Sequence, residues 1–234
     1  MTTETKEVLR FTLNERIQHI LLMICILMLM LTGLSLRFAD TEFGRAIIAL
    51  EGGMASRGFL HRIASVGLIG LWCYHALYVT FSDRGHAQLM AIRPGIQDVK
   101  DVFATLKDRL GFAAQTVRFG RFDFRQKFQY WAVALGVATM TGTGIVLWFE
   151  SEAMAVMPKW VMDLAQIFHS GEGLLIFVVL FVWHLYDAHL RPDVFPMDRT
   201  WLTGKLTVEE LKDRHPLEYE RLFGDQPKGK EGTL

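Results

Sequence analysis

Four long apolar segments dominate this chain of 234 residues, and each reaches or approaches the length that crosses a lipid bilayer. A helix needs about 20 apolar residues to span the hydrocarbon core of a membrane. Three of the segments contain no charged residue, and the fourth contains only Glu172. The sequence therefore predicts an all-α, integral membrane four-helix bundle. The segments are Ile20 to Leu36, Ile63 to Phe81, Phe128 to Phe149 and Leu164 to Tyr186.

The charge distribution predicts how these helices cross the membrane. If all four segments cross, residues 1–18, 82–127 and 190–234 lie on one side and carry twenty Lys and Arg residues, whereas the other side carries five. Basic loops stay in the cytoplasm. We therefore expect a multi-pass protein of the bacterial inner (cytoplasmic) membrane with both termini in the cytoplasm. The basic residues are expected to contact membrane lipid, and no nucleic-acid partner is expected.

The sequence divides into three parts. Residues 1–14 are expected to form a cytoplasmic N-terminal segment, residues 15–190 the four-helix domain, and residues 191–234 a cytoplasmic tail. In the tail, Thr207 and Glu210 have the spacing of a capping box, which predicts a short helix. The expected transmembrane helices cover about 15–37, 59–81, 128–149 and 162–190.

Histidines are common in and beside the apolar segments. A polar side chain inside a membrane is costly and is usually functional. At about 1.5 Å and 100° per residue, His61 and His75 share nearly one face of the second helix, about 21 Å apart along it. His169 and His184 are placed similarly on the fourth helix. Six of the eight histidines lie in or at the ends of the helices: His19, His61, His75, His169, His184 and His189.

These histidines fall at two depths of the predicted bundle. His61 and His169 share the periplasmic level, and the cytoplasmic level contains His19, His75 and His184. A b-type haem takes one axial imidazole from each of two helices, whereas zinc takes three or four ligands at one depth. The pattern predicts two b haems, one between His61 and His169 and one between two of the three other histidines. The sequence has no CxxCH motif for covalent c-type haem.

Small residues end the first and third helices alike, as Thr32-Gly33 and Thr143-Gly144. They have two interpretations, which are close helix packing and room for a flat macrocycle beside the backbone. Glu172 also has two, since it lies one turn after His169: it orients a haem ligand, or it makes a hydrogen bond between helices. Structural or interfacial roles are expected for three other histidines, His86, His189 and His215.

Five short motifs occur in order between about residues 8 and 190. They are Arg16-Ile-Gln-His19, Leu60-His61-Arg62, Gln126-Lys127-Phe-Gln-Tyr-Trp131, Phe168-His169-Ser-Gly-Glu-Gly173 and Trp183-His184-Leu-Tyr186. With these motifs the chain resembles the cytochrome b (gamma) subunit of membrane-bound formate dehydrogenases. It is also similar to the b-type cytochromes of nickel–iron hydrogenases and thiosulfate reductases.

The resemblance implies which histidines bind haem. Carried over, His19 and His184 hold the cytoplasmic haem, and His61 and His169 hold the periplasmic haem. The resemblance also implies a quinone, menaquinone or ubiquinone, beside the cytoplasmic haem. Two features depart from the family pattern: the spacing from His169 to His184 is one residue longer, and His75 is extra. A b6-type arrangement, in which His75 replaces His19, is the alternative. We favour His19, and His75 is then expected near the quinone or a haem propionate.

The function that the resemblance implies is that of a membrane cytochrome b subunit in a respiratory oxidoreductase complex, without substrate catalysis of its own. It is expected to move electrons between quinone and periplasmic iron–sulfur or multihaem cytochrome c subunits. The tail from His189 to Lys205 is more similar to b-type cytochromes that work with multihaem c-type cytochromes. The alternatives are a stand-alone transmembrane reductase and a non-redox membrane protein that binds a metal ion.

Overall fold

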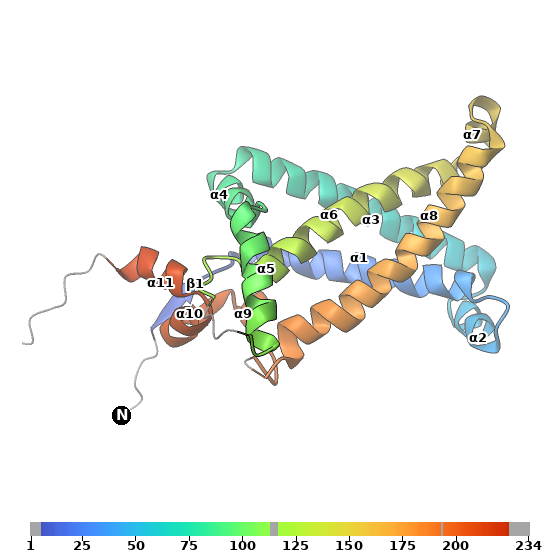
Figure 1. The fold of residues 1–234 in the computed structure, drawn as a ribbon. Coiled ribbons are helices and arrows are strands. Elements are labelled where there is room, and N and C mark those ends of the chain that lie inside the picture. Colours follow the sequence, from blue (N-terminus) through green and yellow to red (C-terminus); the bar gives the residue numbers. More distant parts are fainter. Residues whose placement is uncertain (1–5, 113–116, 193, 225–234) are drawn as a thin grey trace, which may run out of the picture.

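The structure is a computed structural model that describes residues 6–112, 117–192 and 194–224. Within these residues it confirms the predicted all-α membrane bundle, because four helices are long and apolar enough to cross a membrane. Figure 1 shows them running between a group of short elements at one end and helices α2 (Glu42–Leu50) and α7 (Glu150–Val156) at the other. The four helices are α1 (Leu13–Arg37), α3 (Met54–Phe81), α6 (Phe124–Trp148) and α8 (Lys159–Phe177), which continues through the π-helical segments η1 (Val178–His184) and η2 (Tyr186–Leu190).

Polar caps set where two of the spanning helices begin. At α1, the Thr12 hydroxyl accepts from the Glu15 backbone N–H (3.3 Å), and the Glu15 carboxylate accepts from the Thr12 N–H (2.7 Å). Asp123 and Gln126 form the same capping box at α6. A capping box pairs backbone donors that a helix end otherwise leaves unsatisfied. Both helices therefore begin in polar sequence, before the apolar segments from which they were predicted.

The spanning helices pack in two main pairs and expose apolar surface around them. α1 packs chiefly against α3, and α6 packs chiefly against α8. Small residues allow a close approach between such helices. An added Cβ at Gly136 of α6 would lie 3.3 Å from the Glu172 carboxylate and 3.4 Å from Ile176 of α8. Many large apolar side chains of the four helices are exposed, which is typical of a surface that contacts lipid.

Segments from near both ends of the chain meet at one end of the bundle. β1 (Glu7–Leu9) pairs antiparallel with β2 (Lys205–Thr207), and Val8 lies opposite Leu206. We call β1, β2 and the three helices α9–α11 the cap, this end of the bundle the cap end, and the end with α2 and α7 the far end. The other short helices are α4 (Asp83–Ile92), α5 (Ile96–Arg109), α9 (Thr200–Thr203), α10 (Val208–Arg214) and α11 (Pro216–Phe223).

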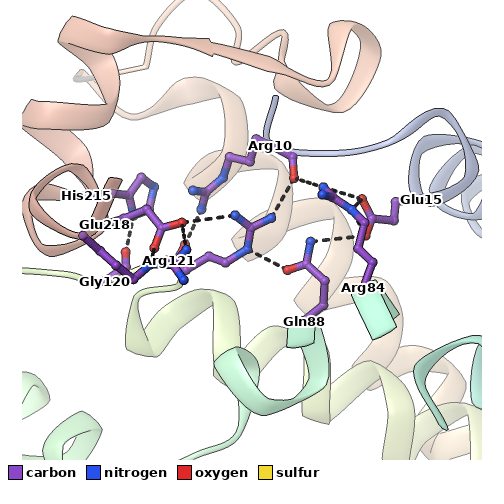
Figure 2. Close-up of polar contacts among 9 residues, drawn as sticks. Arg10, Glu15, Arg84, Gln88, Gly120, Arg121, His215 and Glu218 are labelled. Atoms are coloured by element: carbon purple, nitrogen blue, oxygen red, sulfur yellow. Dashed lines mark hydrogen bonds and ion pairs between the residues drawn. The ribbon is translucent and has the colours of Figure 1, made fainter. Parts of the chain in front are cut away.

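Arginine side chains connect the cap to the bundle (Figure 2). Arg121 donates to the Arg10 carbonyl (2.7 Å) and to the Glu218 carboxylate (3.3 Å). Arg84 of α4 donates to the same Arg10 carbonyl (3.0 Å) and pairs with Glu15 of α1 (3.2 Å). Burial, together with the neighbouring Arg121 guanidinium, lowers the pKa of Arg10 to about 10. Arg10 is therefore still a cation at neutral pH, and the network joins β1, α1, α4 and α11.

His215 makes the cap sensitive to acid. Its ring is buried, and its Nδ1 donates to the Gly120 carbonyl (2.7 Å). Burial, and next the Arg10 guanidinium, lower the pKa of His215 from 6.5 to about 4. Between these two values an unfolded cap binds a proton that the folded cap does not. We therefore expect the cap to lose stability as the pH falls from 6.5 towards 4, measured as lower protection factors in β1 and β2 once amide exchange is corrected for its intrinsic pH dependence.

The matched control is a pair of substitutions. His215→Gln removes the titrating group, so we expect a weaker pH dependence of β1 and β2 exchange in this window. His86→Gln changes an exposed histidine of α4 and should leave the dependence as it is. Equal pH dependence in the two variants would contradict the assignment to His215.

Candidate functional site

His61 of α3 and His169 of α8 face one another towards the far end of the bundle. Their ring centres are 6.3 Å apart, and the ring planes make an angle of 67°. His61 lies two turns into α3, which follows α2, and His169 lies in the middle of α8, which follows α7. The structure thus brings together the two histidines that the sequence placed at one level.

A threonine hydroxyl holds each of these two rings. The Thr32 hydroxyl lies 2.8 Å from His61 Nδ1, and the Thr143 hydroxyl lies 2.9 Å from His169 Nδ1. Each hydroxyl donates its own hydrogen to a carbonyl of the preceding helical turn. Towards the histidine, the hydroxyl oxygen can therefore act only as a hydrogen-bond acceptor. We accordingly assign the ring hydrogen to Nδ1. This leaves both Nε2 atoms unprotonated and able to bind a metal ion.

A glycine follows each threonine and lies against the ring. An added Cβ at Gly33 would lie 3.6 Å from Cε1 of His61, and one at Gly144 only 3.1 Å from Cε1 of His169. A side chain at Gly144 would push the ring out of place. The two Thr-Gly pairs therefore form matching supports for the two histidines, one from α1 and one from α6.

His19 of α1 and His184 of η1 form a second pair towards the cap end. Their ring centres are 6.4 Å apart, with 53° between the planes. The side-chain oxygen of Gln129, on α6, lies 2.9 Å from His184 Nδ1. An amide oxygen only accepts, so His184 also carries its hydrogen on Nδ1 and leaves Nε2 unprotonated. Nδ1 of His19 is buried and has no hydrogen-bond partner among the described residues.

His75 has a different environment from these four histidines. Its Nδ1 lies 2.7 Å from the side-chain oxygen of Gln18, and its Nε2 lies 3.0 Å from the Tyr130 hydroxyl. Both ring nitrogens are therefore engaged in hydrogen bonds to side chains. The structure brings His19, and not His75, to His184.

The spacing of both pairs fits one metal ion between the two rings. An imidazole nitrogen lies about 1.2 Å from its ring centre, and a bond from nitrogen to metal is about 2 Å, so two imidazoles on opposite sides of an ion have centres about 6.4 Å apart. The pairs measure 6.3 and 6.4 Å. Among the described residues, no group of three or more His, Cys, Asp or Glu side chains could hold a metal ion. Two imidazoles per site suit haem iron, because the porphyrin supplies the other ligands.

The model of the prokaryotic cytochrome b561 family matches residues 10–195, which is most of the chain. The chain belongs to this family. Membership implies haem b and electron transfer, and the four spanning helices agree with a prokaryotic inner-membrane protein. The two histidine pairs therefore fit haem b, the cofactor that membership of the cytochrome b561 family implies.

Two curated relatives agree with the resemblance predicted from the motifs. The formate dehydrogenase cytochrome b556 subunit of Haemophilus influenzae is 26% identical over 214 residues, which cover 91% of this chain and 82% of the relative. The formate dehydrogenase cytochrome b556(fdo) subunit of Escherichia coli strain K12 is 23% identical over 217 residues, covering 92% and 93%. The predicted similarity to formate dehydrogenase cytochrome b subunits is thereby confirmed.

Several residues of this cytochrome b561 site were not expected from the sequence. Thr32 and Thr143 belong to the repeated Thr-Gly pairs, which the sequence alone could not distinguish from a packing motif. Gln129 lies within the motif at the start of the third apolar segment, and the helical periodicity does not reveal its partner. Trp201 follows the last spanning helix, yet its ring centre is 6.2 Å from that of His19. Glu172, for which the sequence left two roles open, lies against Gly136 of α6.

The hydroxyl of Thr143 is expected to contribute to haem binding. Thr143→Val removes the acceptor for the His169 Nδ1 hydrogen with little change of shape. Loss of such a partner typically weakens metal binding by about 10- to 100-fold. We expect faster haem loss from this variant, measured as haem transfer to an added scavenger protein. Thr139→Val is the control, because Thr139 lies one turn earlier and its hydroxyl donates to the Leu135 carbonyl (3.1 Å). Equal haem loss from both variants would contradict the assigned role.

Proposed function

We propose that this chain binds two b haems and carries electrons across the inner membrane. The observation that supports this most directly is the presence of two histidine pairs in one bundle, with ring centres 6.3 and 6.4 Å apart. His61 and His169 would hold one haem, and His19 and His184 the other. His169 and His184 are fifteen residues apart in the sequence, which corresponds to about 22 Å of helix. The two haem sites thus lie at different depths of a hydrocarbon core that is roughly 30 Å thick.

The side chains around the four histidines prepare them as ligands. Bound haem b supplies a one-electron couple between ferric and ferrous iron. Thr32, Thr143 and Gln129 accept the Nδ1 hydrogens of three of the histidines, which keeps each Nε2 directed at the metal position as a neutral donor. The apolar helices around both sites leave the four rings half-buried. Axial ligands, their hydrogen bonds and this burial together set the potential of a haem.

The orientation of the chain follows from its basic residues. The cap end contains α4, α5 and the cap, which belong to the segments that carry most of the Lys and Arg. By the positive-inside rule, the cap end faces the cytoplasm and the far end faces the periplasm. The haem of His61 and His169 is then the one that exchanges electrons with a periplasmic redox partner. The relatives are named as formate dehydrogenase subunits, which supports a redox subunit as that partner. The resemblance noted above implies that this subunit contains iron–sulfur clusters or c-type haems.

We place the quinone reaction at the cap end, beside the haem of His19 and His184. The resemblance noted above implies menaquinone or ubiquinone at this level of the membrane. His75, with Gln18 and Tyr130, forms a half-buried polar group between α1, α3 and α6. Gln18 is the neighbour of His19 on α1, so this group lies at the level of the cap-end haem. The group is a candidate contact for the quinone.

Liposomes test the electron path. The purified chain is inserted into vesicles that contain trapped ferricyanide, and dithionite is added outside. We expect the trapped ferricyanide to be reduced much faster than in protein-free vesicles or in vesicles with the His169→Ala variant. Reduction of bound haem without faster reduction of the trapped ferricyanide would contradict transport of electrons across the membrane.

A further inference from the structure

Four buried nitrogen atoms gather around the cap-end histidine pair without a hydrogen-bond partner among the described residues. They are His19 Nδ1, His189 Nδ1, Arg16 Nε and Trp201 Nε1. The ring of Trp201 joins the group, because its centre lies 6.2 Å from that of His19 and 6.4 Å from that of His189. Arg16 lies one turn before His19 on α1, and its guanidinium donates to the Thr203 carbonyl (3.3 Å). The four residues come from α1, η2 and α9, and α1 is far from the other two elements in the sequence.

The chemistry of these atoms indicates what they bind. A buried polar atom without a partner is costly, and native proteins pair nearly all of them. The indole and guanidinium nitrogens only donate, and Arg16 also carries a positive charge. The missing partner is therefore an acceptor and preferably an anion. A carboxylate fits, since it accepts several hydrogen bonds and bonds strongly to arginine.

Haem b carries carboxylate groups on its propionate side chains, and His19 is one of its proposed ligands. We propose that Trp201, His189 and Arg16 bind a propionate carboxylate of the cap-end haem, so that the segment after the last spanning helix completes this site. The inference rests on the proposed function. A quinone carbonyl is the other acceptor that reaches this level, but it has no charge to match Arg16.

Backbone contacts hold Trp201 in position for this role. The Gly204 carbonyl accepts from the backbone N–H groups of Arg10 (2.7 Å) and Phe11 (3.0 Å), just before α1 begins. Gly204 has φ of 77°, and an added Cβ would lie 2.2 Å from the Phe11 carbonyl oxygen. Only glycine fits this close contact. The short helix α9, which carries Trp201, is therefore fixed against the start of α1, the helix that carries His19.

Potentiometric titration of the purified chain tests the proposal, with the two haems followed by their absorbance. Trp201→Phe removes the N–H and keeps an aromatic ring, and Arg16→Gln removes the charge. Each leaves a propionate charge less compensated, which favours ferric iron. We expect both variants to retain two haems and to lower the midpoint potential of one haem, with the larger shift in Arg16→Gln. The control is Trp160→Phe, which changes a tryptophan of α8 that is 63% exposed and should shift neither potential.

Three results would overturn the proposal. The first is that Trp201→Phe and Arg16→Gln both have the same two midpoint potentials as Trp160→Phe. The second is loss of one haem in His189→Gln, which would make His189 an axial ligand. The third is unchanged potentials with weaker binding of a quinone analogue, which would assign the site to quinone. Absence of haem from the unsubstituted chain would instead contradict the proposed function, so the two failures are distinguishable. If Trp201→Phe does not accumulate, Arg16→Gln alone decides.

Discussion

Replacing His169 with alanine will leave one b haem per chain instead of the two that we propose for the unsubstituted protein. The substitution removes one of the two imidazoles whose ring centres lie 6.3 Å apart, and a haem held by two axial imidazoles needs both. The cap-end pair, His19 and His184, does not share any ligand with this site. Its haem should therefore remain, with an unchanged absorbance band and midpoint potential. Haem is quantified as the pyridine haemochrome against protein mass.

A histidine outside the sites provides the control for this result. His86→Ala changes an exposed side chain of α4 and should retain both haems. Two haems in His169→Ala would show that another residue binds the far-end iron, and the assignment of the pair would then be wrong. Loss of both haems would point to a failure of folding, which the His61→Ala variant and the thermal stability of the purified chain would test.

Substitution of His19 and of His75 will have opposite outcomes. His19→Ala removes the partner of His184 and should reduce the chain to one haem. His75→Ala should retain two, because both nitrogens of His75 already bond to Gln18 and Tyr130. The His19→Ala/His169→Ala double variant should contain no haem. Retention of two haems in His19→Ala together with loss of one in His75→Ala would establish the b6-type arrangement instead.

The arrangement of the four spanning helices could be predicted from the sequence because membrane helices obey simple constraints. The four apolar segments predict the bundle, and helical geometry alone places His61 with His169 at one depth. The choice between His19 and His75 is a matter of side-chain partners. Gln18 precedes His19 on α1 and bonds to His75, and no spacing in the sequence reveals which of two neighbouring side chains faces a third helix.

The cap depends on contacts that no local pattern encodes. β1 and β2 pair although Glu7 and Thr207 are 200 residues apart, and each strand has only three residues. Trp201 therefore appeared to belong to a separate tail, whereas the structure places it beside His19. The Thr-Gly pairs were visible in the sequence, but packing and ligand support give the same pattern of small residues.

A single spectrum decides whether the two histidine pairs each hold a b haem. The detergent-purified chain is examined by a dithionite-reduced minus oxidised spectrum, with haem and polypeptide quantified in the same sample. We expect a b-type α band and two haems per chain. A folded, purified chain that contains no haem would contradict it.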